Sequence, residues 1–128
     1  VGIPQMEDSW DITWLGDDAG WLNGTAFPGF DGNSVIVGHV FTADGQPGPM
    51  NKLETLQWGD QILVQNGNET LVYAVTSVAY VKPNDPSIFK HSDTSVLTLV
   101  TCKGYNEATG HYNWRVVVKA KLIETRFK

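Results

Sequence analysis

Short apolar runs separated by turn-forming residues extend through most of this chain. The runs are rich in Val, Ile, Thr and Tyr, which favour the pleated, half-buried surface of a β-sheet. Several are apolar at consecutive positions rather than at alternate ones, which is typical of strands in a closed or covered sheet. The pattern predicts strands at Asp11–Thr13, Ser34–Val40, Gln61–Gln65, Thr70–Val81, Val96–Thr101 and Arg115–Ile123.

Turn signals between the runs indicate how the strands connect. Asn66-Gly67 lies between two strand candidates and predicts a β-hairpin, with a loop from Asn66 to Glu69 that is longer than two residues. Helical signal is short and confined to Pro49–Leu56 and to a single turn at Pro86–Lys90. Short strands at regular spacing, with Gly and Pro in the turns, favour a small all-β barrel over a sandwich.

Composition narrows the class of protein further. The 128 residues are 41% hydrophobic and 18% charged, as in an ordinary globular domain with one core. The formal net charge of −5 argues against a nucleic-acid partner, because duplex binding requires a basic face. A single cysteine excludes an internal disulfide and a zinc cluster of several thiolates. No run approaches the roughly 18 apolar residues of a membrane-spanning helix.

Three residues that can carry chemistry stand at the ends of apolar runs. Cys102 ends Thr98-Leu-Val-Thr-Cys102, and His39 ends Val35-Ile-Val-Gly-His39. Arg115 follows the cysteine by thirteen positions, after a polar stretch from Gly104 to Trp114 that is expected to be a loop. A thiolate is a nucleophile, an imidazole can carry a proton, and a guanidinium fits a developing oxyanion. Together they are the parts of a cysteine-dependent acyl-transfer site.

Each of these residues also has an ordinary structural interpretation. The cysteine would be a buried hydrophobe, the histidine a hydrogen-bonded core residue, and Arg115 a rim residue paired with a carboxylate. Thr101 would donate to a substrate backbone or serve only the sheet, and Trp114 is the tryptophan expected to face Arg115. His91 and His111 stand among polar residues and are interpreted as solvated or as structuring their loops. The histidines and the cysteine lack the short ligand spacings of a metal site.

The residues that match a known family are Asn33-Ser-Val-Ile-Val-Gly-His39, Leu53 through Ile62, Val81-Lys-Pro-Asn-Asp85, Leu97-Thr-Leu-Val-Thr-Cys102, Tyr105-Asn-Glu-Ala-Thr-Gly110 and Arg115. On these residues the chain resembles the bacterial sortases, cysteine transpeptidases that attach proteins to the cell surface. The likeness runs from Gly2-Ile-Pro4 to Leu122, and around the cysteine it is most similar to class A. The Trp-rich N-terminal part and the stretch Phe41–Asn51 do not match one class.

The resemblance implies a closed eight-stranded β-barrel with short helical turns in its loops and an active site in a groove at the strand ends. It implies that Cys102 is the nucleophile, that His39 is the general acid and base, and that Arg115 binds the oxyanion or orients the substrate. No cofactor and no metal ion are expected. The residues expected to bind substrate are Thr101, Val100, Pro83, Ile88, Phe89 and Trp114.

The function implied is cleavage of a Leu-Pro-x-Thr-Gly-like sorting motif after its threonine. An acyl-thioester would form on Cys102 and pass to an amine acceptor, either a cell-wall peptide for anchoring or a pilin lysine for pilus assembly. The family also implies a place at the extracellular face of the bacterial plasma membrane. Since the chain begins at Val1 without an initiator methionine, we expect a single catalytic domain, residues 1–128, whose N-terminal anchor lies outside this chain.

Two other functions are compatible with the same residues. A cysteine hydrolase would use the same three residues but resolve the thioester with water. A non-catalytic β-barrel would bind extended peptides along a groove, and replacing Cys102 would leave that binding intact. The dependence of the reaction on an amine acceptor separates the first from a transpeptidase.

Overall fold

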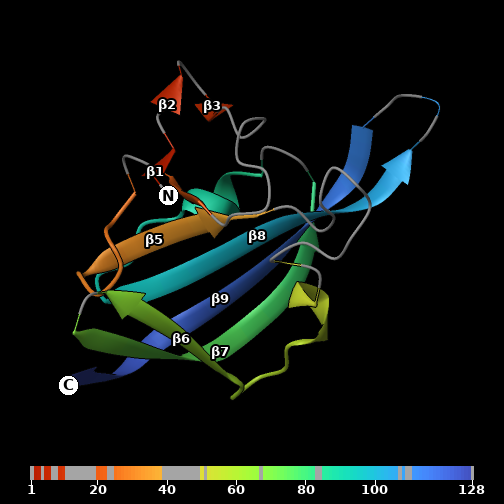
Figure 1. Cartoon of the computed structure of the whole chain (residues 1–128). Coiled ribbons are helices and arrows are strands. Elements are labelled where there is room, and N and C mark those ends of the chain that lie inside the picture. Colours follow the sequence, from red (N-terminus) through yellow and green to blue (C-terminus); the bar gives the residue numbers. More distant parts are fainter. Residues whose placement is uncertain are drawn as a thin grey trace.

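The computed structural model describes residues 2–3, 5–6, 9–10, 20–22, 25–38, 50, 52–66, 68–82, 85–106, 108 and 111–127. Within this part the fold is all-β, as predicted, and seven strands form one curled sheet (Figure 1). Their order across the sheet is β1 (Gly2–Ile3), β4 (Gly20–Leu22), β5 (Gly32–Val37), β8 (Ser95–Asn106), β9 (His111–Phe127), β7 (Glu69–Val81) and β6 (Gln61–Asn66). The short strands β2 (Gln5–Met6) and β3 (Ser9–Trp10) pair separately.

The long strands agree with the apolar runs that predicted them. β6, β7, β8 and β9 contain the expected segments, and β5 contains the expected run from Ser34 to Val37. β5 ends at Val37, so Gly38 is not part of it. Residues 39–40 and the strand expected at Asp11–Thr13 lie outside the described residues. β5 starts earlier than predicted, at Gly32, whose φ of 118° favours glycine.

Two loops are shorter than the sequence predicted. The polar stretch from Gly104 to Trp114 was expected to be a loop, and this is wrong, because β8 and β9 continue as a paired ribbon to Asn106 and His111. Figure 1 shows this ribbon running on beyond the neighbouring strands. Asn66 pairs with Glu69, so the hairpin loop has only two residues. In both places backbone pairing extends the ladder through residues that form no continuous apolar run.

The core is divided between the two faces of the sheet. Val116 and Val118 belong to a larger cluster, whereas Val117 between them belongs to a smaller one, because successive residues of a strand point to opposite faces. Coverage of both faces explains why several runs are apolar at every position. The larger cluster is Met50, Leu53, Leu71, Tyr73, Val75, Leu97, Leu99, Val116, Val118 and Ala120, and the smaller one is Leu22, Val35, Ile88, Val100 and Val117.

Two short 3-10 helices place one residue in each cluster. They are η1 (Leu53–Thr55), which buries Leu53 in the larger cluster, and η2 (Pro86–Phe89), which buries Ile88 in the smaller one. Both fall within the two segments where the sequence predicted helical turns. η2 therefore lies over the same face of the sheet as Val117 and Val100.

Candidate active site

The ends of several strands lie together at one end of the sheet, where β8 and β9 continue beyond it as the two-stranded ribbon. Cys102 of β8 is the cross-strand partner of Arg115 of β9, and Arg115 is in turn the partner of Val81 at the end of β7. β5 runs parallel to β8 and ends with the pair Val37–Val100. The sequence predicts a loop from Gly104 onward, but β8 continues through Cys102 to Asn106. Register, rather than a loop, brings positions 102 and 115 together.

Arg115 is half-buried. It lies on the same face of β9 as Val117, two residues further along, and Val117 belongs to the smaller core cluster. Its Nη1 donates to the main-chain oxygen of Trp114 at 3.2 Å. Among the residues that the structure describes, no carboxylate forms an ion pair with this guanidinium. The rim ion pair that was the structural alternative for Arg115 is therefore not formed within that part of the chain.

Thr101 joins β8 to the segment that leads to His39. Its hydroxyl donates to the carbonyl oxygen of Gly38 at 2.8 Å, and the residue is only 4% exposed. The Gly38 N–H donates to Val100 O at 3.2 Å, so both the N–H and the carbonyl of Gly38, the residue before His39, are hydrogen-bonded to β8. His39 itself lies outside the described residues. The hydroxyl hydrogen of Thr101 serves the fold here, and its contact with a substrate stays a prediction.

Thr101→Val is expected to lower the free energy of unfolding by about 1–3 kcal/mol, the usual cost of leaving a buried carbonyl without its donor. Urea unfolding measures the change. Thr55 provides a matched control, because its hydroxyl also donates to a carbonyl, Lys52 O at 2.7 Å, but in an exposed position. Thr55→Val should stay within about 0.5 kcal/mol of the wild type, since water replaces the lost donor. Equal losses in the two variants would contradict a special role for Thr101.

The other residues expected to bind substrate are divided between core and surface. Val100 and Ile88 are 6% and 5% exposed and pack in the smaller core cluster. Phe89, the last residue of η2, is 40% exposed. Pro83 lies outside the described residues. Substrate contacts by Val100, Ile88, Phe89 and Pro83 stay predictions. Among the three of them that the structure describes, only Phe89 has a substantially exposed side chain.

Trp114 does not face Arg115 as the sequence predicted. The two residues are neighbours in β9, and neighbours in a strand point to opposite faces. The Trp114 ring is 42% exposed, and the Nζ of Lys82 lies 5.9 Å from its centroid, within range of a cation–π interaction. Lys82 follows Val81, the partner of Arg115, so the lysine also lies on the face away from Arg115. A role of Trp114 in substrate binding stays a prediction.

η2 is capped at its start by Asp85. The Asp85 carboxylate accepts a hydrogen bond from the Ser87 N–H at 2.8 Å, and hydrogen bonding to Ser87 lowers the pKa of this carboxyl below its ordinary value. Pro86 occupies the first helical position, where its missing N–H costs nothing. The cap fixes where η2 begins.

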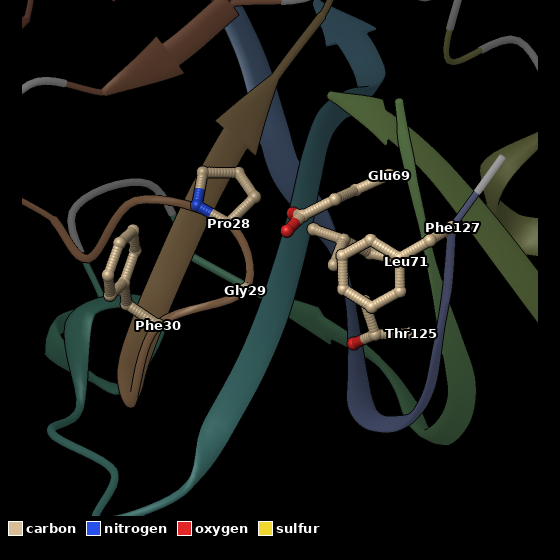
Figure 2. A pocket seen from close by; sticks show the side chains of 7 residues that line it. All are labelled: Pro28, Gly29, Phe30, Glu69, Leu71, Thr125 and Phe127. Carbon is tan, nitrogen blue, oxygen red and sulfur yellow. The ribbon is translucent and has the colours of Figure 1, made fainter. Parts of the chain in front are cut away.

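A groove of about 620 Å³ lies at the other end of the sheet (Figure 2). Glu69 and Phe127, which face it in Figure 2, are cross-strand partners near the end of β9 that is remote from Arg115. Neither Cys102 nor Arg115 is among its described lining residues, so this groove is not the candidate active site. The residues that line it are Pro28, Gly29, Phe30, Glu69, Leu71, Thr125 and Phe127.

Within the described residues, no three His, Cys, Asp or Glu side chains gather in a way that could hold a metal ion. No helix in the same part of the chain is long and apolar enough to cross a membrane.

Sequence reasoning missed two polar residues that contact η2. Asn33 donates to the carbonyls of Ile88 and Lys90, and Lys119 donates to the carbonyl of Ser87. A lysine inside the apolar run of β9 was a usable signal for Lys119, because such a charge needs a polar partner. Asn33 carried no comparable signal, since its partners lie 55 and 57 positions away in the chain.

Comparison with known proteins identifies the family of the chain. A family model described as the sortase domain matches residues 4–123. Sortase A of Staphylococcus aureus is 35% identical over 96 residues, which are 73% of this chain and 46% of that protein. Among solved structures, a sortase from Actinomyces oris matches with a TM-score of 0.74 and 27% identity, over 87% of this chain and 64% of that one. A lid mutant of sortase A from Corynebacterium diphtheriae gives 0.77 and 27%, over 96% and 62%.

The fold and the matched residues define a sortase-type β domain. The chain belongs to the sortase family. It spans about half the length of the Staphylococcus aureus relative.

Proposed function

We propose that this chain is a catalytic domain of a cysteine transpeptidase in which Cys102 is the nucleophile, His39 the general acid and base, and Arg115 the oxyanion-binding group. Sortases are generally cysteine transpeptidases, which supports the reaction class. The observation that carries the assignment is the cross-strand pairing of Cys102 with Arg115. Directly opposed residues of an antiparallel pair project from one face, with Cβ atoms about 4.5–5.5 Å apart. A thiol and a guanidinium in these positions can act on one carbonyl group.

The register of β5 and β8 supports the third member of the site. The last described pair is Val37–Val100, and His39 and Cys102 each follow that pair by two residues. Thr101 and Val100 hold the intervening Gly38 through two hydrogen bonds. Continuation of the same parallel register would therefore bring the imidazole beside the thiol. A neighbouring imidazolium would favour the thiolate form of the cysteine.

In the first half of the reaction, the Cys102 thiolate attacks the carbonyl carbon of the motif's threonine. The carbonyl oxygen becomes an oxyanion that accepts hydrogen bonds from the Arg115 guanidinium. When the C–N bond to glycine breaks, the His39 imidazolium gives its proton to the departing amine, and the acyl group remains on sulfur as a thioester.

In the second half, an acceptor amine attacks the thioester carbonyl. The amine proton passes to His39, a second oxyanion forms opposite Arg115, and its collapse expels the thiolate. The product is a new amide between the sorting motif and the acceptor, and the enzyme returns to its starting state. Net bond count is unchanged because one peptide bond is broken and one is made.

The finer expectations from the resemblance are proposed with the activity. The substrate is a Leu-Pro-x-Thr-Gly-like motif, the acceptor is a cell-wall peptide or a pilin lysine, and the domain works at the extracellular face of the bacterial plasma membrane. The curled sheet would close into the eight-stranded barrel that the resemblance implies. Substrate contacts are proposed for Thr101, Val100, Pro83, Ile88, Phe89 and Trp114.

Intact-mass spectrometry with a Leu-Pro-x-Thr-Gly peptide library, with and without an amine acceptor, tests the proposal. We expect a thioester adduct that disappears when the acceptor is added, with formation of a new amide, and no adduct with Cys102→Ala. Cleavage at a rate that is indifferent to the acceptor would identify a hydrolase. Peptide binding that survives in Cys102→Ala, without any adduct in the wild type, would identify a non-catalytic binding barrel.

A further inference from the structure

η2 is fastened to the sheet through its carbonyl groups. Lys119 of β9 donates from Nζ to Ser87 O at 2.6 Å, and Asn33 of β5 donates from Nδ2 to Ile88 O at 2.9 Å and Lys90 O at 3.1 Å. The donors come from two strands that are not adjacent to each other. Three carbonyls within a four-residue segment are thus held by side chains of the sheet below.

A buried hydroxyl fixes the orientation of the Asn33 amide. Thr98 of β8 donates from Oγ1 to Asn33 Oδ1 at 2.5 Å, so the amide nitrogen must face the η2 carbonyls. Asn33 is 8% exposed and Thr98 is fully buried. Thr98 is also the cross-strand partner of Lys119. Asn33, Thr98 and Lys119 therefore form one polar row across β5, β8 and β9, which we call the tether row.

Lys119 is partly buried, and its ammonium group has a hydrogen-bond acceptor in η2. Burial lowers the pKa of this lysine, as does Lys90, while the Asp85 carboxylate acts in the opposite direction. A partly buried ammonium is stabilised by a short hydrogen bond to a carbonyl, and Ser87 O provides one. The main-chain oxygen of Lys119 accepts a hydrogen bond from Thr76 at 3.1 Å, which also ties this part of β9 to β7.

The tether row lies on the face of the sheet that carries Arg115. Arg115, Val117 and Lys119 alternate along β9 and therefore share one face. Strand residues are about 3.4 Å apart, so Lys119 stands roughly 14 Å from Arg115 along the strand. An extended peptide covers this distance with about four residues. A sorting motif whose threonine carbonyl lies at Arg115 would thus reach η2 with its first residue.

We infer that Asn33 and Lys119 are positioning residues that set the place of η2, and with it Phe89, for recognition of the first residue of the sorting motif. This inference rests on the proposed function. The carbonyls of η2 are held from the sheet and Ile88 packs in the smaller core cluster, so η2 is fixed over the face that carries Arg115, with Phe89 at its end 40% exposed. Loss of the hydrogen bond from Lys119 to Ser87 O would loosen η2 without changing Cys102, His39 or Arg115.

Lys119→Met tests the inference, because methionine keeps most of the apolar stem and removes the ammonium. We expect the KM for the peptide to rise about tenfold, the factor given by loss of one charge-assisted hydrogen bond, with kcat within about twofold. The preference for Leu over Ala at the first motif position should fall by a similar factor. Amide hydrogen exchange across residues 86–90 should become faster, and Lys119→Arg should restore most of the wild-type behaviour.

Lys121→Met is the matched control, since Lys121 is an exposed lysine on the same strand. It should leave KM, kcat and the motif preference unchanged. The rate at which iodoacetamide alkylates Cys102 should be the same in all variants. If Lys119→Met transfers peptide with an unchanged KM and an unchanged motif preference, this inference is wrong while the proposed function stands. If the wild type forms no adduct with any peptide of the library, both are wrong.

Discussion

Arg115→Ala is expected to lower kcat for peptide transfer by about 10²–10³-fold, the usual effect of removing one donor from an oxyanion site. The charge that Arg115 would stabilise appears on the carbonyl oxygen only as the thiolate attacks, so KM should change little. Its guanidinium is suited to this role because no carboxylate among the described residues neutralises it. Single-turnover formation of the thioester adduct, followed by mass spectrometry, measures the loss.

Two variants sharpen this test. Arg126→Ala changes an arginine on the same strand that is exposed and paired with Glu124 at 3.1 Å, and it should leave kcat unaffected. Arg115→Lys keeps the positive charge but loses the planar fork of donors, so its activity should lie between those of the wild type and Arg115→Ala. A kcat that is unchanged in Arg115→Ala would exclude the oxyanion role, whatever the effect on KM.

The sequence predicted the fold class well because the strands of this sheet are covered on both faces. Val116, Val117 and Val118 are apolar in succession, and the structure divides them between two core clusters. The β8–β9 ribbon beyond Cys102 was missed for the complementary reason. Its residues pair through the backbone without a shared apolar face in the sequence, so no hydrophobic period marks them.

The candidate site was only partly accessible to sequence reasoning. Cys102 and Arg115 are thirteen positions apart, and in an antiparallel ribbon such a pair is brought together by the local register alone. The tether row depends instead on contacts between residues far apart in sequence, such as Asn33 with Thr98, 65 positions away. Such contacts follow from the order of strands in the sheet, which the spacing of residues along the chain does not specify.

Leu97→Ala is expected to lower the free energy of unfolding by about 2–5 kcal/mol, the range for a leucine removed from a well-packed core. Leu97 is fully buried in the larger core cluster, and its cross-strand partners are Ala120 on β9 and Ser34 on β5. The loss is a large part of the total stability of a small domain, about 5–15 kcal/mol. Urea unfolding provides the measurement, and Leu97→Met, a volume-conserving change with a cost below about 1.5 kcal/mol, remains measurable if the alanine variant does not fold.

Leu63→Ala is the matched control for this change, because Leu63 of β6 is 56% exposed and the same atoms are removed. Its effect should be within about 0.5 kcal/mol, as for other surface positions. Leu97 begins the segment of β8 that ends at Cys102, so its variants also test whether core packing affects the thiol. At a temperature where the protein remains folded, Leu97→Met should retain the wild-type rate of thioester formation, whereas Arg115→Ala should lose that rate and keep its stability. A parallel loss of rate in Leu97→Met would show that core packing under β8, and not Arg115 alone, controls the geometry at the thiol.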